Sequence, residues 1–416
     1  MSKEPSGGKP SLLQRMRQSN AVVSFLAVVL SLVVGGVLIA VTDEETGAAA
    51  GYFFSRPGDM LAAAWNAAGG AYAAMFRGAI FNYQATGFGE MFRPLTETFT
   101  MAAPLITASL GVALAFRAGL FNIGAQGQII IGAGLAAYVG FAWDLPWPLH
   151  ILLVVLASMI GGAFWGGLVG WIKAKTGAHE VILTIMLNYV AVYLLAYILS
   201  TPLMQRPGSS NPVSPIVHDS AKFPLIFGSD YRVHLGFLIG ILATWGVWWL
   251  LERSTIGFEL KAVGANPAAA RTAGINTTRA TVIAMVAAGA LAGLAGASQV
   301  NGTEYFVTNG IAASIGFDAI TVALLGRSNP LGVFGAALLF GAFRAGGVAM
   351  QSQTGTPIDI VLVVQSLIVL FIAAPPLVRT VFGLNARRKR TEAAVENPPT
   401  PENQPPSSSL TAGSSL

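Results

Sequence analysis

The chain of 416 residues is 54% hydrophobic and only 10% charged, and its formal net charge is +5. Because a soluble domain carries about 25% charged residues, this composition excludes a soluble globular protein and indicates a membrane protein with several spans. The chain contains no cysteine, which excludes disulfides and cysteine-held metal or iron–sulfur sites. Its basic residues lie beside apolar stretches, so the positive charge does not indicate nucleic acid as a partner.

The N-terminal region predicts one membrane span followed by an outer segment. Residues 1–20 are polar and basic, and residues 21–41 form an uncharged apolar run that is long enough to cross a bilayer. A cleaved signal peptide is the alternative, but the run is too long for a typical signal sequence, so we expect a retained span with a cytoplasmic N-terminus. The alanine-rich residues 60–80, with interleaved aromatic residues, are expected to form an interfacial helix on the outer face.

Nine further apolar stretches define the predicted fold. They cover residues 101–116, 123–141, 149–171, 181–199, 235–251, 280–300, 311–325, 331–350 and 358–378. We therefore expect an all-α polytopic transmembrane helical bundle of about ten spans, with both termini in the cytoplasm. Eight spans are the alternative, in which the segments around Asn122 and Ile311 are re-entrant. Gly162, Gly166 and Gly170 lie four residues apart, a spacing that is typical of a helix-contact surface.

The polar segments divide the chain into three parts. We expect a cytoplasmic N-terminal segment at residues 1–20, a transmembrane domain at 21–380 and a cytoplasmic tail at 381–416. The tail begins with basic residues and continues in Pro, Ser, Asn and Glu, a composition that is too polar to pack and predicts disorder. The long loop at 201–232 holds five prolines and is expected on the outer side.

The polar segment at residues 252–279 is flanked by basic residues, which predicts that it is cytoplasmic. Asn266 is suited to cap a short helix, Pro267 to occupy its first position, and Gly274 to end it in the left-handed conformation. Because a helix of two turns is not stable alone in water, it must rest on this protein or on a partner. The residues themselves do not choose between these two interpretations.

Polar residues inside the expected spans mark candidate sites. In residues 121–128, FNIGAQGQ, three amide side chains lie beside two glycines, and they either contact a ligand or hold helices together. Glu180 begins an expected span, where a carboxylate stabilises a helix N-terminus. Asp318 lies inside the short expected span 311–325, where an unpaired acid is costly, so it is a candidate functional residue unless it merely contacts Arg327.

Four stretches resemble the permease subunits of ATP-binding-cassette (ABC) importers, in the family that carries nucleosides, simple sugars and branched-chain amino acids. They are GFELKAVGANPAAARTAGINTTR (257–279), FNIGAQGQ (121–128), AHEVILTIMLNY (178–189) and GFDAITVALLGRSNPLG (316–332). FNIGAQGQ is most similar to the nucleoside-type members, although Gln126 stands where the family more often has an acid. The similarity runs from about Leu95 to Arg379, and it implies a type II ABC importer-like fold.

The resemblance also implies a function. The chain would be the permease subunit of an ATP-driven importer, translocating nucleosides that an extracytoplasmic binding protein delivers to a bacterial inner membrane. ABC ATPase subunits would dock at the 257–279 loop and use ATP, this chain would hold no cofactor, and a second permease subunit, identical or homologous, would complete the path. The implied residues for ATPase coupling are Gly264, Asn266, Pro267, Ala270, Arg271 and Gly274.

A nucleoside offers a flat base and a polar ribose, so its path should combine aromatic rings with amide or acid groups. The candidate path residues are Phe116, Phe121, Asn122, Gln126, Asn188, Asn301 and Asp318. A simple-sugar or branched-chain amino acid permease is the neighbouring alternative. Two alternatives of another class are an ion-coupled secondary transporter, which needs a paired intramembrane acid, and a membrane scaffold.

Several motifs are missing from the sequence. There is no G-x-x-x-x-G-K-[ST], so the chain is not expected to bind ATP in a P-loop. There is no G-x-S-x-G nucleophile motif, and no enzymatic activity is expected. The four histidines are scattered, so no metal site is expected either.

Overall fold

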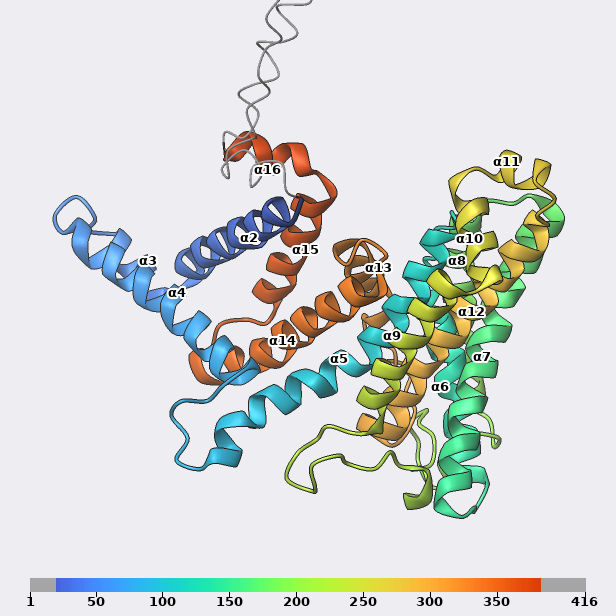
Figure 1. Cartoon of the computed structure of the whole chain (residues 1–416). Coiled ribbons are helices and arrows are strands. Elements are labelled where there is room, and N and C mark those ends of the chain that lie inside the picture. The colour runs from blue at the N-terminus through green and yellow to red at the C-terminus, as the bar shows by residue number, and fades with distance from the viewer. Residues whose placement is uncertain (1–19, 383–416) are drawn as a thin grey trace, which may run out of the picture.

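The computed structural model describes residues 20–382, and throughout this range the regular elements are helices (Figure 1). They are α2 (Asn20–Thr42), α3 (Glu44–Ala50), α4 (Pro57–Ala79), α5 (Phe88–Arg117), α6 (Ala125–Ala142), α7 (Trp147–Thr176), α8 (Glu180–Leu199), η1 (Asp219–Ala221), α9 (Leu235–Arg253), α10 (Thr255–Ala265), α11 (Pro267–Thr272), α12 (Thr277–Ala297), the π-helix η2 (Ser298–Glu304), α13 (Ile315–Leu325), α14 (Pro330–Thr354), α15 (Asp359–Ala373) and α16 (Pro375–Val381). The predicted basic N-terminal segment and the tail from residue 383 lie outside the described residues.

Within residues 20–382, eight helices are long and apolar enough to cross a membrane, namely α2, α5, α6, α7, α8, α9, α12 with η2, and α14. The predicted all-α polytopic bundle is confirmed, and the number of full-length helices in this range is eight, as in the alternative to the ten spans favoured from the sequence. The other two predicted spans became α13, with 11 residues, and α15, with 15. These lengths correspond to about 16 Å and about 22 Å, whereas the hydrocarbon core is about 30 Å thick.

The two short helices are limited in different ways. The predicted span at 358–378 is interrupted at Ala374, because the residue before a proline is disfavoured in a helix and Pro375 follows. The predicted span at 311–325 becomes helical only from Ile315, after a run of turns. The segment around Asn122, in contrast, leads into α6, whose 18 residues are long enough to cross.

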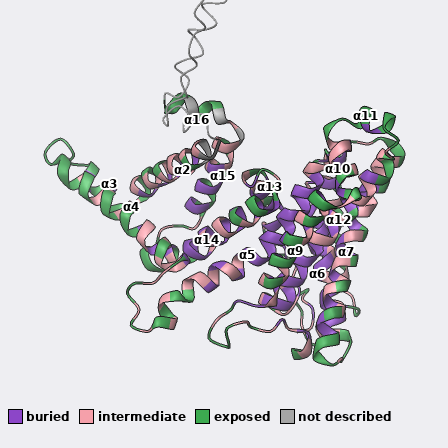
Figure 2. Cartoon of the chain, in the orientation of Figure 1, coloured by how far each residue is buried: buried purple, intermediate pink, exposed green. Residues whose placement is uncertain are grey.

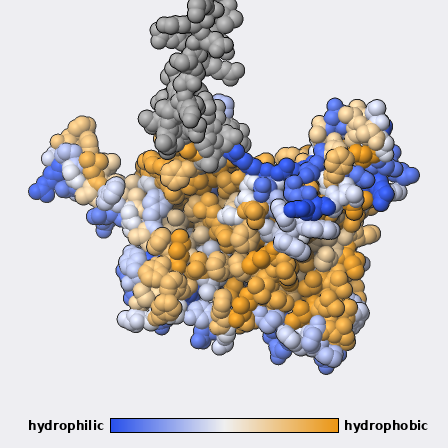
Figure 3. Space-filling model, viewed as in Figure 1, coloured by the Kyte–Doolittle hydropathy of each residue, from blue (hydrophilic) through white to orange (hydrophobic). Residues whose placement is uncertain are grey.

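The bundle is centred on α5. In the apolar 18-residue stretch of α5, 83% of the residues are buried, whereas the corresponding share is 22% in α2 and in α8. Figure 2 shows the buried residues concentrated on α5, α6 and α12, whereas α3 and α11 are largely exposed. Figure 3 shows a broad hydrophobic flank, with hydrophilic residues gathered where α10 and α11 lie. This distribution suits a bundle whose sides face lipid and whose ends face water.

Glycines bring α7 and α12 into backbone contact, at the helix-contact surface that the glycine spacing predicts. A Cβ atom added to Gly162 would lie 2.1 Å from the carbonyl oxygen of Gly289, and one added to Gly293 would lie 2.0 Å from that of Ser158. Any larger side chain would therefore push the two helices apart. The contact surface predicted from the spacing of Gly162, Gly166 and Gly170 is confirmed, since all three approach α12.

The two ends of the bundle differ. At one end, residues 200–234 form an ordered covering, which we call the capping segment; its Ser214 N–H donates to Val307 O at 3.0 Å and its Phe223 N–H to Asn301 O at 2.8 Å. At the other end, α10 and α11 lie beside the turn that joins α5 to α6, and we call this the coupling end. Because α8 runs from Glu180 at the coupling end to the start of the capping segment, the two ends lie on opposite sides of the bundle.

Candidate functional site

The short helix predicted around residue 270 is confirmed as α11. The Asn266 side chain accepts hydrogen bonds from the backbone N–H groups of Ala268 and Ala269, at 3.0 and 3.1 Å. Pro267 begins the helix, and Gly274 follows it with φ +84°, the left-handed conformation predicted for this glycine. Local signals therefore fix both ends of a helix that is too short to be stable by itself.

The α11 helix exposes most of its surface, and Ala270 is its buried residue. Ala270 is buried against the bundle, whereas Arg271 is exposed and reaches Thr277 at 3.5 Å. The small side chain of Ala270 lets the helix lie close to the protein, whereas Ala268 and Ala269 are exposed together with Arg271. This arrangement leaves the outer surface of α11 accessible to another protein.

The α10 helix joins α11 to the core through backbone contact. Gly264, near the end of α10, lies so close to the α5–α6 turn that an added Cβ would sit 2.2 Å from the carbonyl oxygen of Arg117. On the other side of the contact, Gly119 adopts φ +73°, and its own added Cβ would sit 3.0 Å from Gly264 Cα. Displacement of α10 must therefore move this turn, because no flexible side chain lies between the two backbones.

A cavity of about 440 Å³ opens beside this contact. It is lined by Ala118, Gly119, Leu120, Lys173, Ala174, Val263, Gly264, Pro267, Thr277, Thr278 and Thr281. Lys173 forms an ion pair with Glu180 at 2.6 Å, and the other carboxylate oxygen of Glu180 accepts from the backbone N–H of Phe121 at 3.3 Å. Glu180 stands in the first turn of α8, as predicted, and it also ties α7 and α8 to the α5–α6 turn.

The amide groups that follow this turn are buried and bonded to one another. The Asn122 Oδ1 accepts from the Gly124 N–H at 2.9 Å, and its Nδ2 donates to Gln128 Oε1 at 3.1 Å. Asn188 of α8 accepts from the Gly127 N–H at 2.8 Å and donates to Ile123 O at 3.0 Å. These bonds satisfy the backbone where α6 begins.

Gln126 connects α6 to the start of α13. Its Nε2 donates to Ala313 O at 2.7 Å, and its Oε1 accepts from the Gly316 N–H at 3.0 Å. Two residues after Gly316, Asp318 of α13 forms an ion pair with Arg344 of α14. Arg344 also donates to the hydroxyl of Ser314 at 2.6 Å. This ion pair joins two helices, α13 and α14.

The aromatic and remaining amide candidates lie in different places. The rings of Phe116 and Phe121 stack with centroids 4.9 Å apart at the coupling end, and Phe121 is 41% exposed. Asn301 lies on η2 beneath the capping segment, where its Nδ2 donates to Ala221 O at 3.1 Å. The structure brings Gln126 and Asp318 together at α13 but holds Asn301 near the opposite end.

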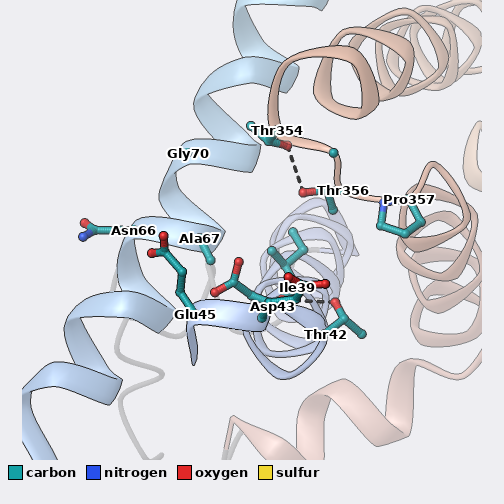
Figure 4. Close-up of a pocket in the computed structure, with 12 residues that line it drawn as sticks. Ile39, Thr42, Asp43, Glu45, Asn66, Ala67, Gly70, Thr354, Thr356 and Pro357 are labelled. Carbon is teal, nitrogen blue, oxygen red and sulfur yellow. Dashed lines mark hydrogen bonds between the residues drawn. The ribbon is translucent and has the colours of Figure 1, made fainter. Parts of the chain in front are cut away.

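A second cavity, of about 530 Å³, lies apart from these residues (Figure 4). It opens between the end of α2, the middle of α4 and the turn after α14, and Asp43, Glu44, Glu45, Asn66 and Thr356 are among its lining residues. None of the predicted path or coupling residues lines it. The predicted residues that lie close together are instead found at α13 and the coupling end.

Arg344 is the important residue that the sequence analysis did not single out. It is the one charged residue in the apolar stretch 331–350, and a charge inside a span is by default a functional candidate. That signal was present in the sequence. Its partner could not be read from the sequence, because Asp318 lies 26 residues earlier and on another helix.

An all-helical bundle with eight candidate spans defines a polytopic membrane protein. Residues 94–373 match the family described as the permease component of a branched-chain amino acid transport system, and the chain belongs to this family. It is therefore a multi-pass membrane permease subunit of an ABC transporter and not an enzyme. ABC permeases act together with ATPase and substrate-binding partners.

Curated relatives cover most of the chain. A guanosine ABC transporter permease of Bacillus subtilis is 36% identical over 88% of this chain and 97% of its own length. A nucleoside ABC transporter permease of Lactococcus lactis is 35% identical over 72% of this chain and 85% of its own. A glucose ABC transporter permease of Haloferax volcanii is 34% identical over 67% and 75%, respectively. No solved structure matches the chain.

Proposed function

We propose that this chain is the permease subunit of an ATP-driven importer that translocates nucleosides. Two of the three relatives described above are named for guanosine or nucleosides, and the B. subtilis permease corresponds to this chain over nearly its whole length. The FNIGAQGQ stretch resembles the nucleoside-type members. A nucleoside is an uncharged polar solute, and the charged groups beside α13 are paired with each other.

The backbone link between Gly264 and the α5–α6 turn carries the mechanistic part of this proposal. An ATPase subunit would hold α11 through its exposed face, including Arg271, and ATP would be used by that partner. Movement of α11 would pass through α10 to the turn, and from the turn through Glu180 and Asn122 to α8 and α6. This chain would hold no cofactor or metal of its own.

The remaining partners follow from the two ends of the bundle. An extracytoplasmic binding protein would deliver the substrate at the end covered by the capping segment. A second permease subunit, identical or homologous, would complete the path beside α13. The coupling end and both termini would be cytoplasmic, in a bacterial inner membrane.

A simple-sugar permease is the second candidate, because the H. volcanii relative is named for glucose. Uptake of labelled nucleosides, sugars and branched-chain amino acids, in cells with and without the gene, separates the two. We expect nucleoside uptake alone to depend on the gene. Loss of sugar or amino acid uptake with unchanged nucleoside uptake would overturn the substrate assignment.

The same assay tests the coupling helix. We expect Arg271→Glu to abolish uptake at normal protein level, since it reverses a charge on the exposed face of α11. Arg56→Glu, an equal charge reversal at an exposed arginine between α3 and α4, is the matched control and should transport normally. Uptake that survives both Arg271→Glu and ATP depletion would favour an ion-coupled transporter.

A further inference from the structure

Residues 305–325 cross the bundle without a continuous helix. At the capping segment, the Tyr305 carbonyl accepts from the Val217 N–H at 2.9 Å. The chain then runs through turns until α13 begins, and after α13 the Ser328 carbonyl accepts from Arg117 Nε at 2.9 Å, at the coupling end. Non-helical backbone at membrane depth occurs where it is buried in protein or lines a water-filled cavity. This broken crossing is therefore a candidate for the wall of an aqueous path.

The charges beside the break lie deep in the bundle. Asp318 is seven residues before the end of α13, about 10 Å along the helix axis. Arg344 is fourteen residues after the start of α14, about 21 Å along its axis, and helix side chains lean toward the N-terminus, which brings its guanidinium group back toward Asp318. Both distances place the ion pair inside the bundle, away from the coupling end.

The ion pair also fixes the N-terminal end of α13. Arg344 binds the carboxylate of Asp318 and the hydroxyl of Ser314, and Ser314 itself donates to Asp318 at 3.1 Å. Gln126 holds the same end from α6 through Ala313 and Gly316. Without these bonds, the first turn of α13 would expose unpaired backbone groups inside the membrane.

The pair is not completely enclosed. In the single chain, the side chains of Arg344 and Asp318 are 21% and 18% exposed, and the neighbouring Phe317 is 51% exposed. Exposure of paired charges to lipid at this depth is costly, so the open side should face water or another protein. Because the two charges neutralise each other, a path along this side would favour an uncharged polar solute.

We propose that the broken crossing forms the wall of the translocation path and that Arg344 is its positioning residue, holding α13 against α14 through Asp318 and Ser314. The exposed Ala313 and Phe317 then face the aqueous path rather than lipid. This inference rests on the proposed transport function, and it adds a residue and a surface to it.

Cysteine accessibility tests the wall, and the absence of native cysteine makes every label specific. Ala313→Cys and Phe317→Cys should react with a charged, membrane-impermeant thiosulfonate in the assembled transporter. Tyr193→Cys on α8, where the tyrosine is 71% exposed on the outside of the bundle, should react only with a lipid-soluble maleimide. If the charged reagent labels neither position 313 nor position 317 in a protein that still transports, the proposal is overturned.

Charge exchange tests Arg344. Arg344→Ala should lower uptake per ATP hydrolysed, because loss of one partner leaves Asp318 as an unpaired charge inside the bundle. The double variant Asp318→Arg/Arg344→Asp should recover transport above either single exchange. Equal loss in the double and single variants, at normal protein level, would overturn the positioning role. Wild-type uptake identifies the substrate independently, so an error in the nucleoside assignment would leave the labelling result intact.

Discussion

Replacement of Gly264 by alanine should disturb the link between the coupling helices and the core. The added Cβ would lie 2.2 Å from Arg117 O and 2.9 Å from the backbone of Ala118 and Gly119. Real Cβ atoms essentially never approach a heavy atom closer than 3.0 Å, so the two backbones must separate by about 0.8 Å, the difference between 3.0 and 2.2. No side-chain rotation can relieve this overlap, because the three nearest atoms all belong to the main chain.

The energetic cost follows from this geometry. Insertion of a methyl group into a packed contact typically costs about 1–3 kcal/mol when backbone must shift. We therefore expect Gly264→Ala to lower the free energy of unfolding by about 2 kcal/mol. We also expect fewer nucleosides transported per ATP hydrolysed, because α10 would no longer hold the α5–α6 turn in register.

The matched control is Gly246→Ala in the adjacent helix α9. Nothing lies within 4 Å of a Cβ built at Gly246, so this substitution should be neutral or stabilising by up to about 1 kcal/mol. Thermal unfolding of the purified complex and ATPase-coupled uptake in proteoliposomes measure the two effects. If Gly264→Ala has the same unfolding temperature and the same uptake per ATP hydrolysed as Gly246→Ala, the proposed backbone link is refuted.

Three further results are expected. Asn188→Leu should destabilise the protein by about 2–4 kcal/mol, because the Gly127 N–H and a carbonyl lose their partners, whereas the exposed Tyr189→Leu should not. Burial lowers the pKa of His234 from 6.5 to about 4, so its contribution to stability is complete above pH 6.5 and is lost as the pH falls toward 4. The free energy of unfolding should therefore fall between pH 7.5 and pH 5 by about 2 kcal/mol more in the wild type than in His234→Asn. Gly162→Ala should cost at least as much as Gly264→Ala in thermal unfolding, since its Cβ would meet a carbonyl oxygen at 2.1 Å, and an unchanged unfolding temperature would contradict the tight α7–α12 contact.

The sequence identified the polar groups of the candidate site but not their roles. Asn122 and Gln126 were expected either to contact a ligand or to hold helices together, and Asn188 was expected to line the path. In the single chain each of the three is hydrogen-bonded to backbone of this protein. A one-dimensional pattern shows that an amide must find a partner, but it does not show which one. Whether these residues also contact a substrate stays a prediction.

Local chemistry determined what the sequence predicted well. The spans follow from runs of apolar residues, α11 follows from Asn266, Pro267 and Gly274, and the α7 contact surface follows from glycines four residues apart. Each of these signals acts within a few residues, so each can be read without a structure.

Only the tertiary structure decided how distant segments meet. It showed that the predicted span 311–325 is a broken crossing, that Asp318 pairs with Arg344 from another helix, and that Gly264 touches the α5–α6 turn. Such contacts depend on the relative placement of helices, which is set by the packing of many side chains at once. The sequence therefore determined which residues this membrane protein must bury and cap, whereas packing determined which of them became partners.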